Sequence, residues 1–252
     1  MTRRPTNLLA LIAANASEAL TSSKYVVVPS GGGGGMGLLS PISAAFAASL
    51  VTLPIAARIP AGNLVVAYAG AYGADAITGL SFADSEPNVY SPAVSFAANI
   101  YREVAIAASR LTATLAVADT ITGQALPATS NPRGLGVGAA AFTGGTSGAP
   151  YAANDSQNAG PAVANVSTSA PVAAGDLIVA AALYLALASG LSIPTPPGWT
   201  ALPSTFGTVA PYHLNISAFF TIAAAAGIQT FTAGAIPSST VLDLVIVAFP
   251  GS

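Results

Sequence analysis

Apolar positions in this chain form short runs rather than the helical spacing of an amphipathic helix. From residue 59 onward, runs rich in Val, Ile, Leu, Tyr, Phe and Thr are bounded by clusters of Gly, Pro, Asn and Asp. Such runs predict β-strands, and the frequent turn residues argue against long helices. A short helix competes with a strand only in the alanine-rich runs at 105–109 and 223–227. We therefore predict an all-β chain of antiparallel β-sandwich type, with jelly-roll and immunoglobulin-like topologies both open.

Three blocks of this pattern occur twice in the same order, and a fourth, 111–115 with 228–232, matches loosely. The first block places a Gly-Asn or Gly-Asp turn directly before an aliphatic run, and the last ends in an aromatic residue followed by a turn. A repeat of this length predicts two tandem domains rather than a solenoid of short units. The matched pairs are 59–67 with 172–180, 99–107 with 215–223, and 137–144 with 244–251.

The repeat and the turn-rich stretches divide the chain into four parts. Residues 38–144 and 162–252 are predicted to be two β-sandwich domains, and the small, polar residues 145–161 a linker. Residues 1–37 form a leader arm that contains the flexible tether Gly31–Gly35. Alternate glycines at 134, 136 and 138 predict close backbone packing.

The leader carries the residues that we expect to dock on a partner. The pattern of its first part predicts a short amphipathic helix. Arg3, Arg4 and the apolar run that follows them also resemble the start of a signal peptide. A second apolar segment follows as a short strand. The predicted docking residues are Leu8, Leu11, Ile12, Tyr25, Val26, Val27 and Val28.

Composition narrows the function classes. The chain has 252 residues, of which 53% are hydrophobic and only 6% are charged, with a formal net charge of −2. This balance excludes bulk disorder, and it lacks the basic surface that nucleic-acid binding requires. With no cysteine there is no disulfide, thiolate metal site or thiol nucleophile. So few charges predict an exterior that is covered by copies of the chain or by a partner.

Candidate catalytic residues are sparse. His213 is the only histidine, and no Gly-x-Ser-x-Gly nucleophile motif accompanies it. Asp84 and Glu86 are the only close carboxylate pair, which we interpret as part of a solvated turn rather than a calcium site. We therefore expect no enzyme activity, no cofactor and no bound metal.

A further pattern lies in the second half. The segments Gly175-Asp-Leu-Ile-Val-Ala-Ala181, Pro196-Pro-Gly-Trp-Thr-Ala-Leu202, Thr230-Phe-Thr232 and Leu244–Gly251 follow one another there. Together they resemble β-sandwich modules of bacteriophage virion proteins and of some bacterial surface proteins, over residues 172–251. The first half shares the opening turn and the closing strand but lacks the Pro-Pro-Gly-Trp element. We expect a structural corner formed by Gly175, Asp176, Pro197, Gly198 and Trp199.

The resemblance implies a structural or adhesive role. We predict a non-enzymatic virion component assembled in the host cytoplasm, either a capsid decoration (cement) protein or a head or tail fibre component. Its partners would be a major capsid or tail protein and copies of itself, without nucleic acid or a membrane span. The alternative is a bacterial adhesin module that is secreted or held at the cell surface.

Overall fold

The computed structural model describes residues 35–127, 133–145, 149–158, 163–189, 191–235 and 239–251 as strands, turns and loops, without a helix in these ranges. The chain is therefore all-β, as predicted, and all its paired strands are antiparallel. The run 105–109 lies within a strand, and 223–227 forms a turn.

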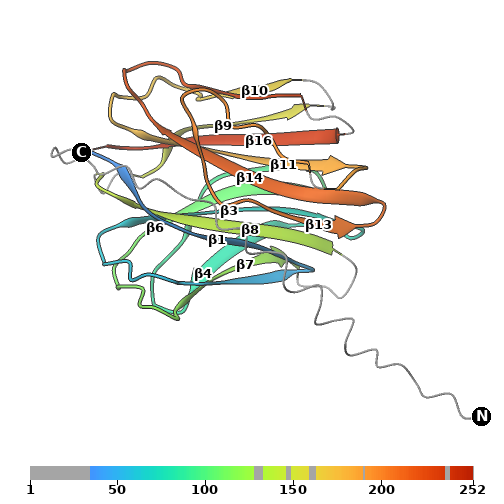
Figure 1. Ribbon diagram of the computed structural model, residues 1–252, viewed down its shortest axis with the longest axis horizontal. Helices are drawn as coiled ribbons and strands as arrows, with labels where there is room; N and C mark the ends of the chain where they lie inside the picture. Colours follow the sequence, from blue (N-terminus) through green and yellow to red (C-terminus); the bar gives the residue numbers. More distant parts are fainter. Residues whose placement is uncertain are drawn as a thin grey trace, which may run out of the picture.

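Two large sheets form the middle of the molecule (Figure 1). The first has the order β1-β8-β3-β6-β5, and the second has the order β12-β14-β11-β16-β9, with β13 also paired to β14. The strands of the first sheet are β1 (Gly37–Ala47), β3 (Leu64–Gly73), β5 (Ser91–Asn99), β6 (Arg102–Arg110) and β8 (Arg133–Thr143). Those of the second are β9 (Tyr151–Asn158), β11 (Leu177–Ala186), β12 (Thr200–Ala201), β13 (Thr205–Val209), β14 (Tyr212–Ile222) and β16 (Ser239–Phe249).

Two small sheets cover the outer faces of the large ones. The first outer sheet has the order β2-β7-β4, with β2 (Leu50–Pro54), β4 (Gly79–Asp84) and β7 (Thr120–Leu126). The second consists of β10 (Ala164–Ser167) and β15 (Thr230–Ala233). The result is a stack of four layers with three apolar cores, one central and two outer.

The central strands of the large sheets are buried on both faces. On β11, Val179 and Leu183 point into the central core, whereas Ile178 and Ala182 point into the second outer core. A strand that is covered on both faces needs apolar side chains at every position. This explains why residues 177–186 form a continuous apolar run. The apolar faces that composition led us to assign to neighbouring subunits are thus covered largely within the chain.

Corresponding strand pairings occur in both halves. In each, a central strand that follows a Gly-Asn or Gly-Asp turn lies between the closing strand of that half and a third strand. β1 pairs with β8 as β9 pairs with β16. The prediction that residues 145–161 form a linker is wrong in part, because β9 occupies residues 151–158. Its small, polar side chains suit an edge strand, which the sequence pattern did not distinguish from a loop.

The middle block of the sequence repeat was aligned four residues out of register. In the first half, the Gly62 backbone N–H donates to Leu111 O (2.8 Å), and the Leu111 N–H donates to Asn63 O (2.9 Å). In the second half, Gly175 N donates to Ala223 O (2.8 Å) and Ala223 N to Asp176 O (2.9 Å). Leu111 therefore corresponds to Ala223, although the sequence placed Ala107 there. A shift by an even number of residues keeps every side chain on its face, so alternation alone does not detect it.

Glycines allow the two large sheets to approach closely. A Cβ added to Gly70 would lie 1.9 Å from Ile216 Cδ1 of the facing sheet, and one added to Gly136 would lie 3.2 Å from Ile216 Cγ1. The close packing that the alternate glycines 134–138 predict is present. Each of these positions admits a neighbouring side chain where a Cβ would otherwise stand.

Candidate functional site

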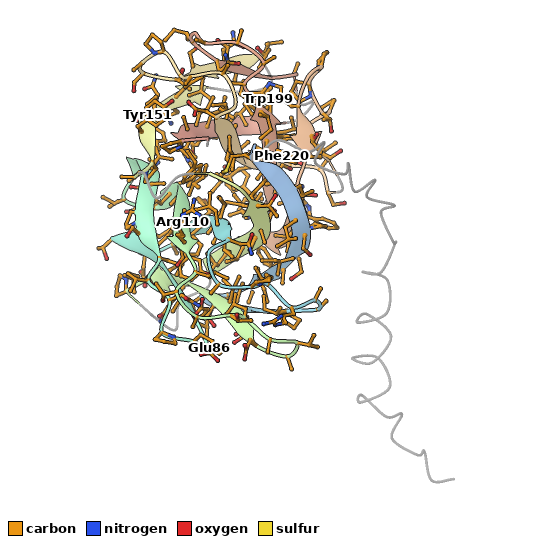
Figure 2. The ribbon with its side chains drawn as sticks, turned by 90° about the vertical axis from the view of Figure 1, so that its left-hand side faces the viewer. Glu86, Arg110, Tyr151, Trp199 and Phe220 are labelled. Atoms are coloured by element: carbon orange, nitrogen blue, oxygen red, sulfur yellow. The ribbon has the colours of Figure 1, made fainter. Side chains whose placement is uncertain are left out.

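The predicted corner contains two separate turns. Gly175 has φ +89° and precedes Asp176, which is 4% exposed. The Asp176 carboxylate accepts hydrogen bonds from the backbone N–H groups of Ala173 (2.7 Å) and Gly251 (2.8 Å) and from the Tyr151 hydroxyl. Asp176 thus joins its own turn to the start of β9 and to the residues that follow β16. Figure 2 labels Tyr151 and views the molecule from the end at which these contacts lie.

The second turn precedes β12. Pro197 and Gly198 are exposed, Gly198 has φ +80°, and the Trp199 backbone N–H donates to Pro196 O (3.1 Å). The Trp199 ring is partly buried and lies edge-to-face on Phe231, with ring centroids 5.1 Å apart. Trp199 therefore closes one side of the second outer core instead of presenting a free stacking surface.

The predicted docking residues Leu8, Leu11, Ile12 and Tyr25–Val28 lie outside the described residues. The described chain begins at Gly35, next to Gly144, and ends at Gly251, next to Gly175. We call this the terminal end of the stack. Here the Arg110 guanidinium, labelled in Figure 2, donates to Gly62 O (2.7 Å).

The candidate catalytic residues make hydrogen bonds within their own turns and hairpins. Asp84 accepts hydrogen bonds from the Glu86 backbone N–H (3.0 Å) and the Asn88 side chain (3.1 Å). Burial raises the pKa of Asp84 against the opposing effect of these bonds. Asn88 in turn accepts from the backbone N–H groups of Thr112 and Ala113, so the carboxylate braces two turns. His213 contacts Thr208 Oγ1 (3.0 Å) across the β13–β14 hairpin.

A cavity that sequence reasoning missed lies at the opposite end, which we call the cavity end. It has a volume of about 410 Å³ and opens between the two large sheets, where β3 and β11 end and β6, β14 and β16 begin. Tyr72 and Tyr212 approach each other edge-to-face across the sheets, with centroids 5.8 Å apart. Its lining residues are Tyr72, Gly73, Ala74, Asn99, Tyr101, Arg102, Leu185, Tyr212 and Val241.

A buried ion pair lies beside this cavity. Arg102 Nε and Nη2 donate to the two carboxylate oxygens of Asp243, and the Nη2 to Oδ1 distance is 3.4 Å. Arg102 is 6% exposed and Asp243 is fully buried, so both members of this salt bridge are shielded from solvent. Burial raises the pKa of Asp243, while the guanidinium acts in the opposite direction.

The ion pair links β6 of the first large sheet to β16 of the second. A charged residue inside an apolar strand signals a need for a buried partner. The sequence shows that signal at Asp243, within the apolar run of β16, whereas Arg102 is the first residue of β6. Their separation of 141 positions left the pairing undetermined.

The described ranges contain neither a helix long and apolar enough to cross a membrane nor a group of His, Cys, Asp or Glu side chains suited to hold a metal ion. Comparisons with protein-family models, with curated proteins and with solved structures found no match to this chain.

Proposed function

We propose that this chain is a structural, non-enzymatic component of a bacteriophage virion, a capsid decoration protein or a head or tail fibre component. The proposal rests on the contacts that the motif residues make in the structure. Asp176 and Gly175 hold a turn against both neighbouring strands, and Trp199 fills a core. The residues behind the resemblance thus hold the fold together, as a structural module requires.

In this proposal the chain consists of two tandem β-sandwich repeats that follow a leader arm. In the order β1-β8-β3-β6-β5 opposite β2-β7-β4, the first strand of the repeat, β1, is the neighbour of its last strand, β8. This order supports the jelly-roll over the immunoglobulin-like topology. The central apolar core joins the repeats into one block, which suits a subunit that is used in many copies.

Neighbouring subunits would contact the two ends of this block. Val89, Val117 and Ile228 are exposed in turns at the terminal end, and Ile100 and Leu187 are exposed at the cavity end. Burial of such side chains stabilises an interface by about 25 cal/mol for each Å² of apolar surface removed from water. Because few charges take part, association should depend little on ionic strength.

Particle incorporation tests this proposal. Cells infected with the phage that encodes the chain would supply either the full chain or a variant lacking residues 1–35, and particles would be purified on a density gradient. We expect the full chain in the particle fraction at low and at raised salt, and we expect the truncated chain to remain folded but outside it. Absence of the full chain from particles would refute the virion role, whereas normal incorporation of the truncated chain would refute docking by the leader.

The adhesin alternative makes a different prediction for the same leader. A secreted module would lose its first residues near Ala16, where the sequence resembles a cleavage site. Amino-terminal sequencing of the protein from its native source separates the two, because a retained leader supports the virion role.

A further inference from the structure

We propose that the cavity between the two large sheets binds a single saccharide residue, held by the tyrosines around it and by the outward side of the Arg102 guanidinium. The inference is independent of the proposed function, because it rests only on the chemistry of the cavity. Its volume of about 410 Å³ lies within the range of small-molecule sites, roughly 300 to 1,000 Å³.

The polar anchor of the site is Arg102. It is 94% buried, as its 6% exposure shows, and it lines the cavity. Within the described residues its guanidinium bonds only through Nε and Nη2, both to Asp243. The two N–H groups of Nη1 thus remain as donors for an oxygen atom in the cavity, since guanidinium offers five donors and no acceptor.

The walls of the site are aromatic. Tyr72 and Tyr212 meet at an interplanar angle of 85°, so their rings present surfaces in two directions. Tyr101 stands beside them at the tip of the β5–β6 hairpin and is 43% exposed. The Asn99 side chain holds this hairpin by accepting a hydrogen bond from the Tyr101 backbone N–H (2.8 Å). Tyrosine combines a flat apolar ring with a polar hydroxyl at little cost in conformational entropy.

These features match a sugar ring more closely than other ligands. A sugar has an apolar face of C–H groups for the tyrosines and hydroxyl or ring oxygens for Arg102 Nη1. Asp243 neutralises the Arg102 charge, so the cavity has no excess positive charge with which to select an anion. Only Leu185 and Val241 contribute large aliphatic side chains, too few to line a site for a lipid tail.

Saturation-transfer NMR on the full chain tests the site with a defined panel: the methyl glycosides of glucose, galactose, mannose, rhamnose and N-acetylglucosamine, at millimolar concentration. We expect transfer to the C–H protons of at least one glycoside. Tyr101→Ala should weaken the affinity for it by about ten-fold, as loss of a central aromatic contact does at binding sites. Phe206→Ala is the matched control, because Phe206 is an exposed ring (58%) that does not line the cavity, and it should leave binding unchanged.

A double variant tests the anchor without leaving a buried charge. Arg102→Met with Asp243→Leu replaces the ion pair by apolar side chains, a change that proteins often tolerate. It should abolish transfer while the protein still unfolds cooperatively. Absence of transfer from all five glycosides to the unaltered chain, or equal transfer to the chain carrying Tyr101→Ala, would overturn the proposal. If the double variant does not fold, the Tyr101→Ala measurement alone decides.

Discussion

The two large sheets have corresponding strand orders, yet the side chains that they bring to their mutual contact differ in size. The first sheet brings Gly70 and Gly136 to the contact, and the second brings Leu183 and Ile216. Large side chains of one sheet therefore fill spaces that glycines leave in the other. The close contact at these positions therefore depends on the difference in side-chain size between the facing residues of the two sheets.

The outer layers differ as well. Three strands cover the first outer core, whereas two strands and the loop that carries Leu191 and Trp199 cover the second. The Trp199 ring packs on Phe231, and the ring centroids of Phe231 and Phe219 are 5.0 Å apart. Large aromatic rings thus provide in the second half the burial that an additional strand provides in the first.

Removal of one member of the buried ion pair should have the largest effect on the contact between the halves. Asp243→Ala leaves the Arg102 charge buried without a partner, and loss of one partner of such a pair costs about 3 to 5 kcal/mol. Urea unfolding of this variant measures the loss. The double change Arg102→Met with Asp243→Leu serves as the control, and we expect it to remain close to the original stability. A small effect of Asp243→Ala would show that the pair does not hold the halves together.

Filling a glycine space should have the next largest effect. Gly70→Ala places a methyl group 1.9 Å from Ile216 Cδ1, and overpacking of this kind costs about 1 to 3 kcal/mol. Ile216→Val removes that Cδ1 atom, so the double variant should be more stable than the sum of the single effects predicts. A double-mutant cycle by urea unfolding measures this coupling, and strict additivity would contradict the proposed complementarity.

The corresponding turns of the two halves offer a smaller, symmetric test. Gly62 and Gly175 have φ of +85° and +89°, and an added Cβ meets no atom within 4 Å at either position. Alanine at either site should therefore cost only the backbone strain of the left-handed region, about 1 to 2 kcal/mol. Thermal unfolding of Gly62→Ala and Gly175→Ala should give equal losses. A clearly larger loss in one half would show that the turns are not equivalent.

The smallest effect concerns Glu103, whose place on β6 corresponds to Asn215 on β14. The Asn215 amide donates to Leu191 O (2.8 Å), whereas burial alone raises the pKa of Glu103 above its ordinary value. Because the folded state then binds the Glu103 proton more tightly than the unfolded chain does, the contribution of Glu103 to stability is present at low pH. It is lost as pH rises through the raised pKa.

Glu103→Gln removes this titration and makes the first half resemble the second. We expect the variant to gain stability relative to the original chain between about pH 4 and pH 7, measured by urea unfolding at several pH values. A constant difference across this range would show that the Glu103 carboxyl is not desolvated in the folded protein.

The local features of the fold were accessible from the sequence because neighbours along the chain determine them. The aliphatic run 177–186 and the turn at Gly175 identify a buried strand and its start without reference to any distant residue. The position of the Pro197-Gly198-Trp199 turn was recognisable for the same reason, since turn chemistry and a large aromatic residue are visible within a few positions.

Only the tertiary structure decided how these pieces meet. The pairing of Arg102 with Asp243, the place of β9 at the edge of a sheet and the cavity between Tyr72 and Tyr212 all join segments far apart in the sequence. The alternation of side chains is unchanged by an even shift in register, and burial is satisfied equally by a neighbouring subunit or by the other half of the chain. The residue pattern therefore determines that an apolar face must be covered, whereas the three-dimensional packing determines what covers it.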